Sequence, residues 1–269
     1  MGGDGSENSL LNQMLTNTQS FVEKAAQLIL DSNYTCAFTG AGISAESGIP
    51  PFRGEGGLWS KYNPEVLEMN FFFAHPLASW TVIKEIFYNF FTGVSPNHAH
   101  LALADWEHKG YLQSLITQNI DQLHFKAGNK EVYSFHGNSS QLICISCHQS
   151  VEATPNLLSV LPPLCNICGC VLKPDFIFFG EGIPEEAYRQ SVKAAQKSQL
   201  FFIIGTSGEV SPANQIPVIA KESGAVIIEI NKDKSLYTNR ISDFFIQGKA
   251  GDILPEINQF ILQTKAKTL

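Results

Sequence analysis

Residues 34–50, YTCAFTGAGISAESGIP, decide the fold of this chain. The run 34–39 is rich in β-branched and aromatic residues, which is typical of a short buried strand. Gly40 and Gly42 follow at once, and glycines in that place let the backbone turn tightly and approach a pyrophosphate group. The stretch therefore predicts a strand that leads into a dinucleotide-binding turn. The alternative is a tight strand–helix turn that binds nothing.

The rest of the chain alternates between helical and strand patterns. We expect helices at residues 20–31, 97–109, 184–198, 213–223 and 251–263. We expect further strands at residues 112–118, 131–135, 200–204, 225–230 and 244–246. Continuously apolar strands that alternate with helices are typical of a parallel sheet covered on both faces. The sequence thus predicts an α/β fold with a Rossmann-like, doubly wound parallel sheet.

Two irregular stretches interrupt this alternation. Residues 51–92 join a glycine-containing loop to short, phenylalanine-rich helical patterns, and residues 139–174 carry two Cys-x-x-Cys pairs. We expect the two stretches to fold together as a smaller domain. The remaining segments, 18–50, 93–138 and 175–264, would then form one discontinuous cofactor-binding domain that follows a flexible tail at residues 1–17.

The paired cysteines have the spacing of a zinc site. Cys144-x-x-Cys147 is followed, after 17 residues, by Cys165-x-x-Cys168. Two such turns present four thiolates, which complete a tetrahedral shell and leave no open position, so the one zinc ion per chain would be structural. Buried reduced thiols are the alternative. Cys170 could compete as a ligand, although the pair at 165 and 168 already matches the first pair.

Glycines and polar side chains end several of the predicted strands. They are Gln118, Asn119 and Asp121 after one strand, and Gly205, Thr206, Ser207 and Asn231 after two others. Ligands of open α/β sheets bind at those ends, although turn formation and helix capping would explain the same residues. His136 also ends a strand, as a structural histidine or as a general base. The acidic residue that a dehydrogenase needs after its second strand is missing from the pattern, so hydride transfer is not supported.

Composition narrows the function classes. The chain has 269 residues, 44% of them apolar, which excludes an intrinsically disordered protein. Its net charge is −7 and its only arginines are Arg53, Arg189 and Arg240, so we expect no nucleic-acid partner. No apolar run approaches the roughly 20 residues of a membrane helix. The cysteine pairs favour a reducing compartment, and we expect a cytoplasmic protein, or a nuclear one in a eukaryote. Gly2 and Ser6 fit a myristoylation pattern, which an ordinary flexible tail would also produce.

Taken together, the motifs between residues 20 and 262 resemble those of the sirtuin family, in the family's order. They are GAGISAESGIP at 40–50, FRG at 52–54, TQNID at 117–121, FHG at 135–137, the four cysteines, KP at 173–174, FFGE at 178–181, GTS at 205–207 and EIN at 229–231. Sirtuins are NAD-dependent protein-lysine deacylases, with a Rossmann-like domain and a smaller domain made of a zinc ribbon and a helical module. The resemblance implies NAD and structural Zn²⁺ as cofactors, and acylated lysine peptides or proteins as substrates of a monomer.

The resemblance also implies the roles of individual residues. NAD would be bound by Gly40, Ala41, Gly42, Phe52, Arg53, Gln118, Asn119, Asp121, Gly205, Thr206, Ser207 and Asn231. The substrate backbone would pair, as an added strand, with Ile177, Phe179, Gly180, Glu181, Gly208 and Val210. Catalysis would fall to Asn119 and to His136 as general base, with nicotinamide and 2′-O-acyl-ADP-ribose as products. Pro51 stands where many members have Asp, at the entrance of the cofactor loop.

The sequence also indicates which acyl groups such an enzyme would remove. In the desuccinylating branch a Tyr is followed three residues later by an Arg, whereas here Tyr88 is followed at that spacing by Phe91. Burying an acidic acyl group without a cationic partner is costly. We therefore expect neutral acyl groups, including ones longer than acetyl, and not succinyl. The phenylalanines of this segment could instead be only the core of the helical module.

Two other functions use the same cofactor site. One is transfer of ADP-ribose to a protein, which would not need a peptide channel or His136. The other is a non-catalytic NAD-binding sensor, although the presence of His136, Asn119 and Asp121 argues against it.

Overall fold

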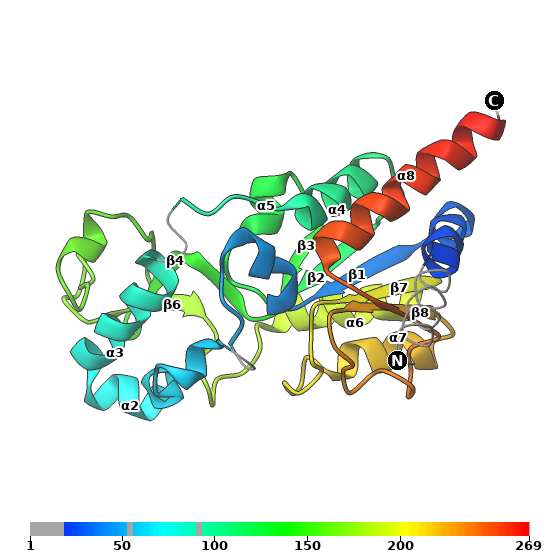
Figure 1. Cartoon of the computed structure of the whole chain (residues 1–269). Coiled ribbons are helices and arrows are strands. Elements are labelled where there is room, and N and C mark those ends of the chain that lie inside the picture. The colour runs from blue at the N-terminus through cyan, green and yellow to red at the C-terminus, as the bar shows by residue number, and fades with distance from the viewer. Residues whose placement is uncertain (1–18, 53–55, 90–92, 269) are drawn as a thin grey trace, which may run out of the picture.

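The computed structural model describes residues 19–52, 56–89 and 93–268, and its central element is a six-stranded sheet. The strand order is β3-β2-β1-β7-β8-β9, and all neighbours are parallel (Figure 1). The strands are β1 (Thr35–Thr39), β2 (Ser114–Thr117), β3 (Val132–Ser134), β7 (Leu200–Ile204), β8 (Val226–Asn231) and β9 (Phe244–Gln247). The order reverses at β1, which pairs with β2 on one side and β7 on the other. This confirms the predicted doubly wound α/β fold.

Alternate residues of each strand point to opposite faces of the sheet, and helices cover both faces. Ala37 faces a core built with residues 19–31, α4 (His98–His108) and α8 (Ala250–Thr268). Phe38 faces the core formed with α6 (Glu185–Lys197) and α7 (Gln215–Glu222). Because both faces are buried, the strands are largely apolar on both faces, which is why their sequence pattern is continuous rather than alternating.

The predicted helices and strands are present, with ends that differ by a few residues; α8, for example, continues beyond the predicted residue 263 to Thr268. The glycine motif after β1 leads into a 3-10 helix, η1 (Ala41–Ser47), rather than an α-helix. Gly48 ends it in the left-handed conformation, with φ 87°, and Pro50 follows. A left-handed glycine and a proline close together stop helix growth, so only a short turn forms.

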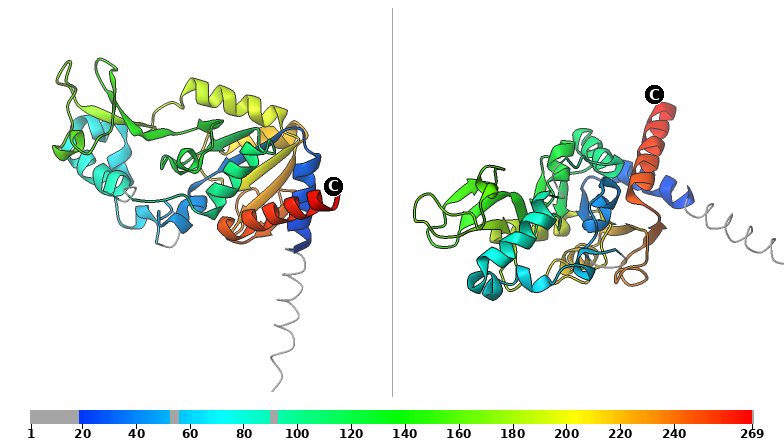
Figure 2. Two further views of the ribbon diagram at one scale, coloured as in Figure 1. Left: turned by 90° about the horizontal axis from the view of Figure 1, so that it is seen from above. Right: turned by 60° about the vertical axis from the view of Figure 1, so that its left-hand side comes forward.

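The two irregular stretches share one hydrophobic core. The helical module consists of η2 (Leu58–Ser60), η3 (Pro64–Leu67), α2 (Met69–Ala74), α3 (Pro76–Ile83) and the π-helical turn η4 (Lys84–Asn89). The cysteine stretch forms an antiparallel sheet, β5-β4-β6, from β4 (Gly137–Cys144), β5 (Ser150–Glu152) and β6 (Leu172–Phe176), with η5 (Leu157–Ser159) and the loops around it. Both contribute side chains to the same buried cluster. Figure 2 shows them side by side, at the end of the molecule away from the C-terminus.

Packing accounts for the large aromatic residues of the helical module. Phe72 and Phe87 are fully buried, and the indole nitrogen of Trp80 donates to the carbonyl of Leu172 at 2.8 Å. Phe90 and Phe91 lie outside the described residues. Within the described part of the chain, no helix combines the length and apolarity needed to span a membrane.

Candidate active site

The loops that follow β1 and β7 meet where the strand order of the sheet reverses. The N–H of Gly42 donates to the carbonyl of Gly205 at 2.8 Å, and the N–H of Gly40 donates to that of Ile204 at 3.0 Å. A Cβ on Gly40 would lie 2.7 Å from the Gly205 oxygen, and one on Gly42 would lie 2.8 Å from the Gly205 Cα. Only glycines allow this approach, and a sheet of this type binds its ligands at this crevice.

The polar residues after β2 are bonded to the loop after β1. The Asn119 amide nitrogen donates to the Gly40 carbonyl at 3.0 Å and to Ser44 Oγ at 3.2 Å. Ser44 in turn donates to the carboxylate of Asp121 at 2.6 Å. Asp121 also accepts the N–H of Leu123 at 2.9 Å, so the turn interpretation holds alongside the site interpretation. Burial raises the pKa of Asp121, because water is excluded from its carboxylate.

Thr206 joins three of the strand-end loops. Its Oγ1 accepts the side-chain amide of Gln118 at 3.0 Å, and its carbonyl accepts that of Asn231 at 2.8 Å. Thr206 is buried, whereas Gly42 and Ser207 are exposed at the surface. Ten of the twelve residues predicted to contact NAD, all except Phe52 and Arg53, therefore come together at the ends of β1, β2, β7 and β8, in a cradle that fits a dinucleotide.

His136 lies in the turn between β3, the edge strand of the large sheet, and β4 of the small sheet. Its Nδ1 is 3.0 Å from the carbonyl oxygen of Gln118. A carbonyl only accepts, so Nδ1 carries the proton and Nε2 is left able to accept one. Burial lowers the pKa of His136, which keeps the ring neutral near pH 7. Gly137 follows with φ 74°, and a Cβ there would lie 2.9 Å from Phe176 Cα, so the turn is fitted against β6.

Two histidines that the sequence analysis missed lie beneath this site. His124 Nε2 is 3.0 Å from Thr39 Oγ1, and His100 Nε2 is 3.5 Å from Ser44 Oγ. Their ring centroids are 4.8 Å apart. Burial lowers the pKa of His100 to about 4, so it is neutral near pH 7. For His100, the signal in the sequence was a histidine on the apolar side of the predicted helix 97–109.

The segment predicted to bind the substrate backbone runs between the His136 turn and the helical module. The N–H of Ile177 donates to the His136 carbonyl at 2.9 Å, and the N–H of Phe179 donates to the Leu67 carbonyl at 2.8 Å. Gly180 is exposed, and the carboxylate of Glu181 turns back into its own loop.

The second predicted substrate segment rests on an aromatic ring. A Cβ on Gly208 would lie 2.8 Å from Cε2 of Tyr237, so only glycine fits there. Val210 is half-buried two residues further on.

The predicted cofactor loop is only partly described. The ring of Phe52 packs against Trp59 and Phe87, with centroids 5.5 and 6.2 Å away, in the core of the helical module. Arg53 lies outside the described residues, and its role stays a prediction.

The four paired cysteines form a cluster that fits a zinc ion. All four sulfur atoms lie within 4.8 Å of one another, and those of Cys144 and Cys168 are 3.4 Å apart. Tetrahedral zinc with Zn–S bonds of about 2.3 Å requires sulfurs about 3.8 Å apart. Backbone N–H groups lower the pKa of two of the thiols. The N–H of Cys147 is the main cause that lowers the pKa of Cys144 to about 6, and the N–H of Cys168 lowers the pKa of Cys165. Cys170 is outside the cluster.

Comparison with known proteins gives a consistent result. The Sir2 family matches residues 40–212. The chain is 44% identical to "NAD-dependent protein deacylase 2" of Pyrobaculum aerophilum, over 86% of this chain and 92% of that protein. A Sir2 homolog–NAD complex has a TM-score of 0.83 at 38% identity, with 90% of this chain and 94% of that one covered. A Sir2 complex with a deacetylated p53 peptide and 3′-O-acetyl-ADP-ribose has a TM-score of 0.82 at 32% identity, covering 88% and 96%. The chain therefore belongs to the Sir2 family, the sirtuins, as its motifs predicted.

Proposed function

We propose that this chain is an NAD-dependent protein-lysine deacylase that releases nicotinamide and 2′-O-acyl-ADP-ribose. The enzyme class follows from family membership and from the NAD-dependent deacylase relative. The observation that carries the chemistry is His136, whose Nε2 is free to accept a proton beside the loop of Gln118 and Asn119. The solved complex that contains a deacetylated peptide and O-acetyl-ADP-ribose supports the product class.

The chain's own residues bind and orient the reactants in this proposal. NAD supplies an electrophilic ribose carbon when nicotinamide leaves. Ser44 holds the carboxylate of Asp121, and the Asn119 amide nitrogen is occupied by Gly40 and Ser44, which leaves Asn119 Oδ1 for the ligand. The acyl oxygen of lysine is a weak nucleophile, so precise placement supplies most of the rate advantage. His136 Nε2 accepts the proton at the ribose hydroxyls.

Replacement of the base tests this assignment. His136→Ala should retain NAD binding within a few fold and lose turnover by about 10²-fold or more, because a positioned base contributes 10²–10⁴-fold. Mass spectrometry of a reaction with NAD and an acetyl-lysine peptide identifies the products. O-acyl-ADP-ribose from the wild type supports the proposal. An increase in protein mass would instead indicate an ADP-ribosyltransferase, and unchanged NAD a binding protein.

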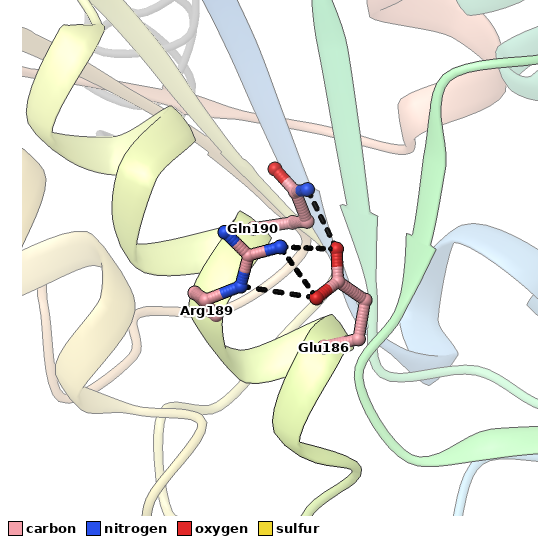
Figure 3. Close-up of polar contacts among 3 residues, drawn as sticks. All are labelled: Glu186, Arg189 and Gln190. Atoms are coloured by element: carbon pink, nitrogen blue, oxygen red, sulfur yellow. Dashed lines mark hydrogen bonds and ion pairs between the residues drawn. The ribbon is translucent and has the colours of Figure 1, made fainter.

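We further propose that the enzyme prefers neutral acyl groups, including ones longer than acetyl, over succinyl. Arg189, the next arginine after Arg53 in the sequence, lies on α6 and is paired with Glu186 at 2.6 Å (Figure 3). The segment 56–89 contains no arginine, so a succinyl carboxylate buried there would lack a guanidinium partner. Rates on peptides that differ only in acetyl, octanoyl and succinyl groups test this. A succinyl rate above the other two would overturn it.

Two expectations about the protein in the cell belong to the same proposal. The first is that the active unit is a monomer. The zinc-fitting cluster of four reduced cysteines supports a reducing compartment, and we propose the cytoplasm. Light scattering of the purified enzyme and microscopy of a tagged chain test the two points.

A further inference from the structure

Lys173, on β6, is a buried lysine whose ammonium group is bonded to its own loop. Only 5% of the residue is exposed. Nζ donates to the carbonyls of Pro174 and Phe176, each at 2.8 Å, and lies 3.0 Å from Oε2 of Glu181. It also lies 4.3 Å from the ring centroid of Phe178. The Lys173 side chain therefore contacts four residues of the segment 174–181.

Glu181 completes the closure from the other end of the segment. Its Oε2 accepts the N–H of Phe178 at 2.6 Å, in addition to the contact with Lys173. The carboxylate is therefore directed into the loop. The ring of Phe178 is buried beneath and packs edge-on against Phe72, with centroids 5.4 Å apart. We call Lys173 and Glu181 the loop clasp.

The clasped loop touches the other parts of the site on its two sides. The N–H of Ile177 is bonded to His136, in the turn between β3 and β4, and that of Phe179 to Leu67 of the helical module. Phe179 and Gly180 are exposed. The loop is therefore fixed from inside, because the N–H groups of Ile177, Phe178 and Phe179 are bonded within the protein. An added strand would pair with the Gly180 N–H and with carbonyl groups of this segment.

Stability alone is a weak reason for this arrangement. Burial lowers the pKa of Lys173, and the nearby Glu181 opposes that shift. The Lys173 side chain is 6% exposed and that of Glu181 is 23% exposed. Ion pairs in such positions add little net stability, because desolvation offsets the attraction, so this pair is better explained by the geometry that it imposes.

We propose that Lys173 is a positioning residue for the peptide substrate, which acts through Glu181 to hold residues 177–181 in the conformation that pairs with the substrate backbone. The inference rests on the proposed deacylase function and deepens it. It also changes the expected role of Glu181, from a contact with the peptide to a member of the loop clasp.

The first test separates positioning from folding. Lys173→Met keeps the length of the side chain and removes its charge, and it should raise the KM for an acetyl-lysine peptide about tenfold, because misplacement of about 1 Å costs up to 10²-fold. The rise should be far smaller for acetyl-lysine amide, which has almost no backbone to pair. Lys173→Arg, which can still pair with Glu181, should restore most of the peptide KM. A fall in kcat at unchanged KM would mean loss of folded enzyme and would overturn the positioning role.

The second test asks whether the two residues act as one unit. Glu181→Gln and the double variant Lys173→Met/Glu181→Gln should raise the peptide KM by about as much as Lys173→Met alone. If the KM increases of the two single variants multiply in the double variant, Glu181 contacts the peptide independently of Lys173. That result would overturn the loop clasp. Arg189→Met, which removes the exposed ion pair on α6, is the matched control and should leave the KM unchanged. A wild-type chain that turns over no acyl peptide would refute the proposed function itself, separately from either result.

Discussion

The edge of the large sheet and the cysteine module are held in place in different ways. The sheet edge is fixed by burial, because each strand that ends at the site contributes side chains to the cores on both faces. The cysteine module has a three-stranded sheet and leaves apolar side chains exposed, with Val160 at 72% and Ile167 at 67%. A small module with so little core needs a cross-link, and four clustered thiols offer one. The edge of the large sheet is therefore expected to depend on packing, and the cysteine module on a metal.

Removal of the metal should give the largest effect, and it should separate the cysteine module from the large sheet. Cys165→Ser should abolish stoichiometric zinc and reduce peptide deacylation by more than about 10²-fold, since structural zinc contributes roughly 10–16 kcal/mol to folding in small metal-dependent domains. NAD binding, which depends on the large sheet, should fall much less. Metal analysis, calorimetry and binding titration measure the three quantities.

Cys170→Ser is the matched control, because this sulfur lies outside the cluster. It should keep zinc and activity. Full deacylase activity in a zinc-free enzyme would contradict the dependence of the cysteine module on its metal.

Loss of a buried charge at the edge of the large sheet should raise stability, whereas loss of the metal lowers it. Asp121→Asn keeps an acceptor for the Leu123 N–H and places an amide NH2 opposite Ser44 Oγ, which can accept from it. The change removes a carboxylate that is 6% exposed. Because burial raises the pKa of Asp121, its charge opposes folding at neutral pH. The variant should unfold about 2–4 °C higher, for a gain of about 1 kcal/mol, and lose most of its turnover. A lower melting temperature would show that the carboxylate stabilises the loop.

The turn that links the two regions should give the smallest and most specific effect, on pH dependence. As the proposed base, His136 would act in its neutral form, and burial moves its pKa below the ordinary value of 6.5. As the pH falls, kcat/KM should therefore stay level through 6.5 and decline only at lower pH. A pH–rate profile with a midpoint above 6.5 would contradict the neutral, buried imidazole.

The fold was predictable because its signals are local. The run 34–39, the glycines at 40 and 42 and the cysteine spacing each report a structure within a few residues, and the order of the elements then fixes a doubly wound sheet. The placement of the cofactor residues at one edge also follows, since parallel strands end on the same side.

The fine structure of the site could not be read in the same way, because it depends on contacts between distant residues. Ser44 and Asp121 are 77 positions apart, yet they share a hydrogen bond. The direction of the Glu181 carboxylate depends on Lys173 and on the turn at Phe178. Neither arrangement has a spacing rule that a single sequence reveals.

The contact between Gly42 and Gly205 has a consequence for how the protein is made. A chain that is still leaving the ribosome holds the first half of the cofactor cradle long before Gly205, Thr206 and Asn231 have been synthesised. Until β7 and β8 join the sheet, the loop after β1 has nothing to rest against, and Gln118 and Asn231 have no Thr206 to bond. Nascent fragments that stop before β7 should accordingly be unable to retain the nucleotide, so that only chains completed through the second half of the sheet can become enzymes.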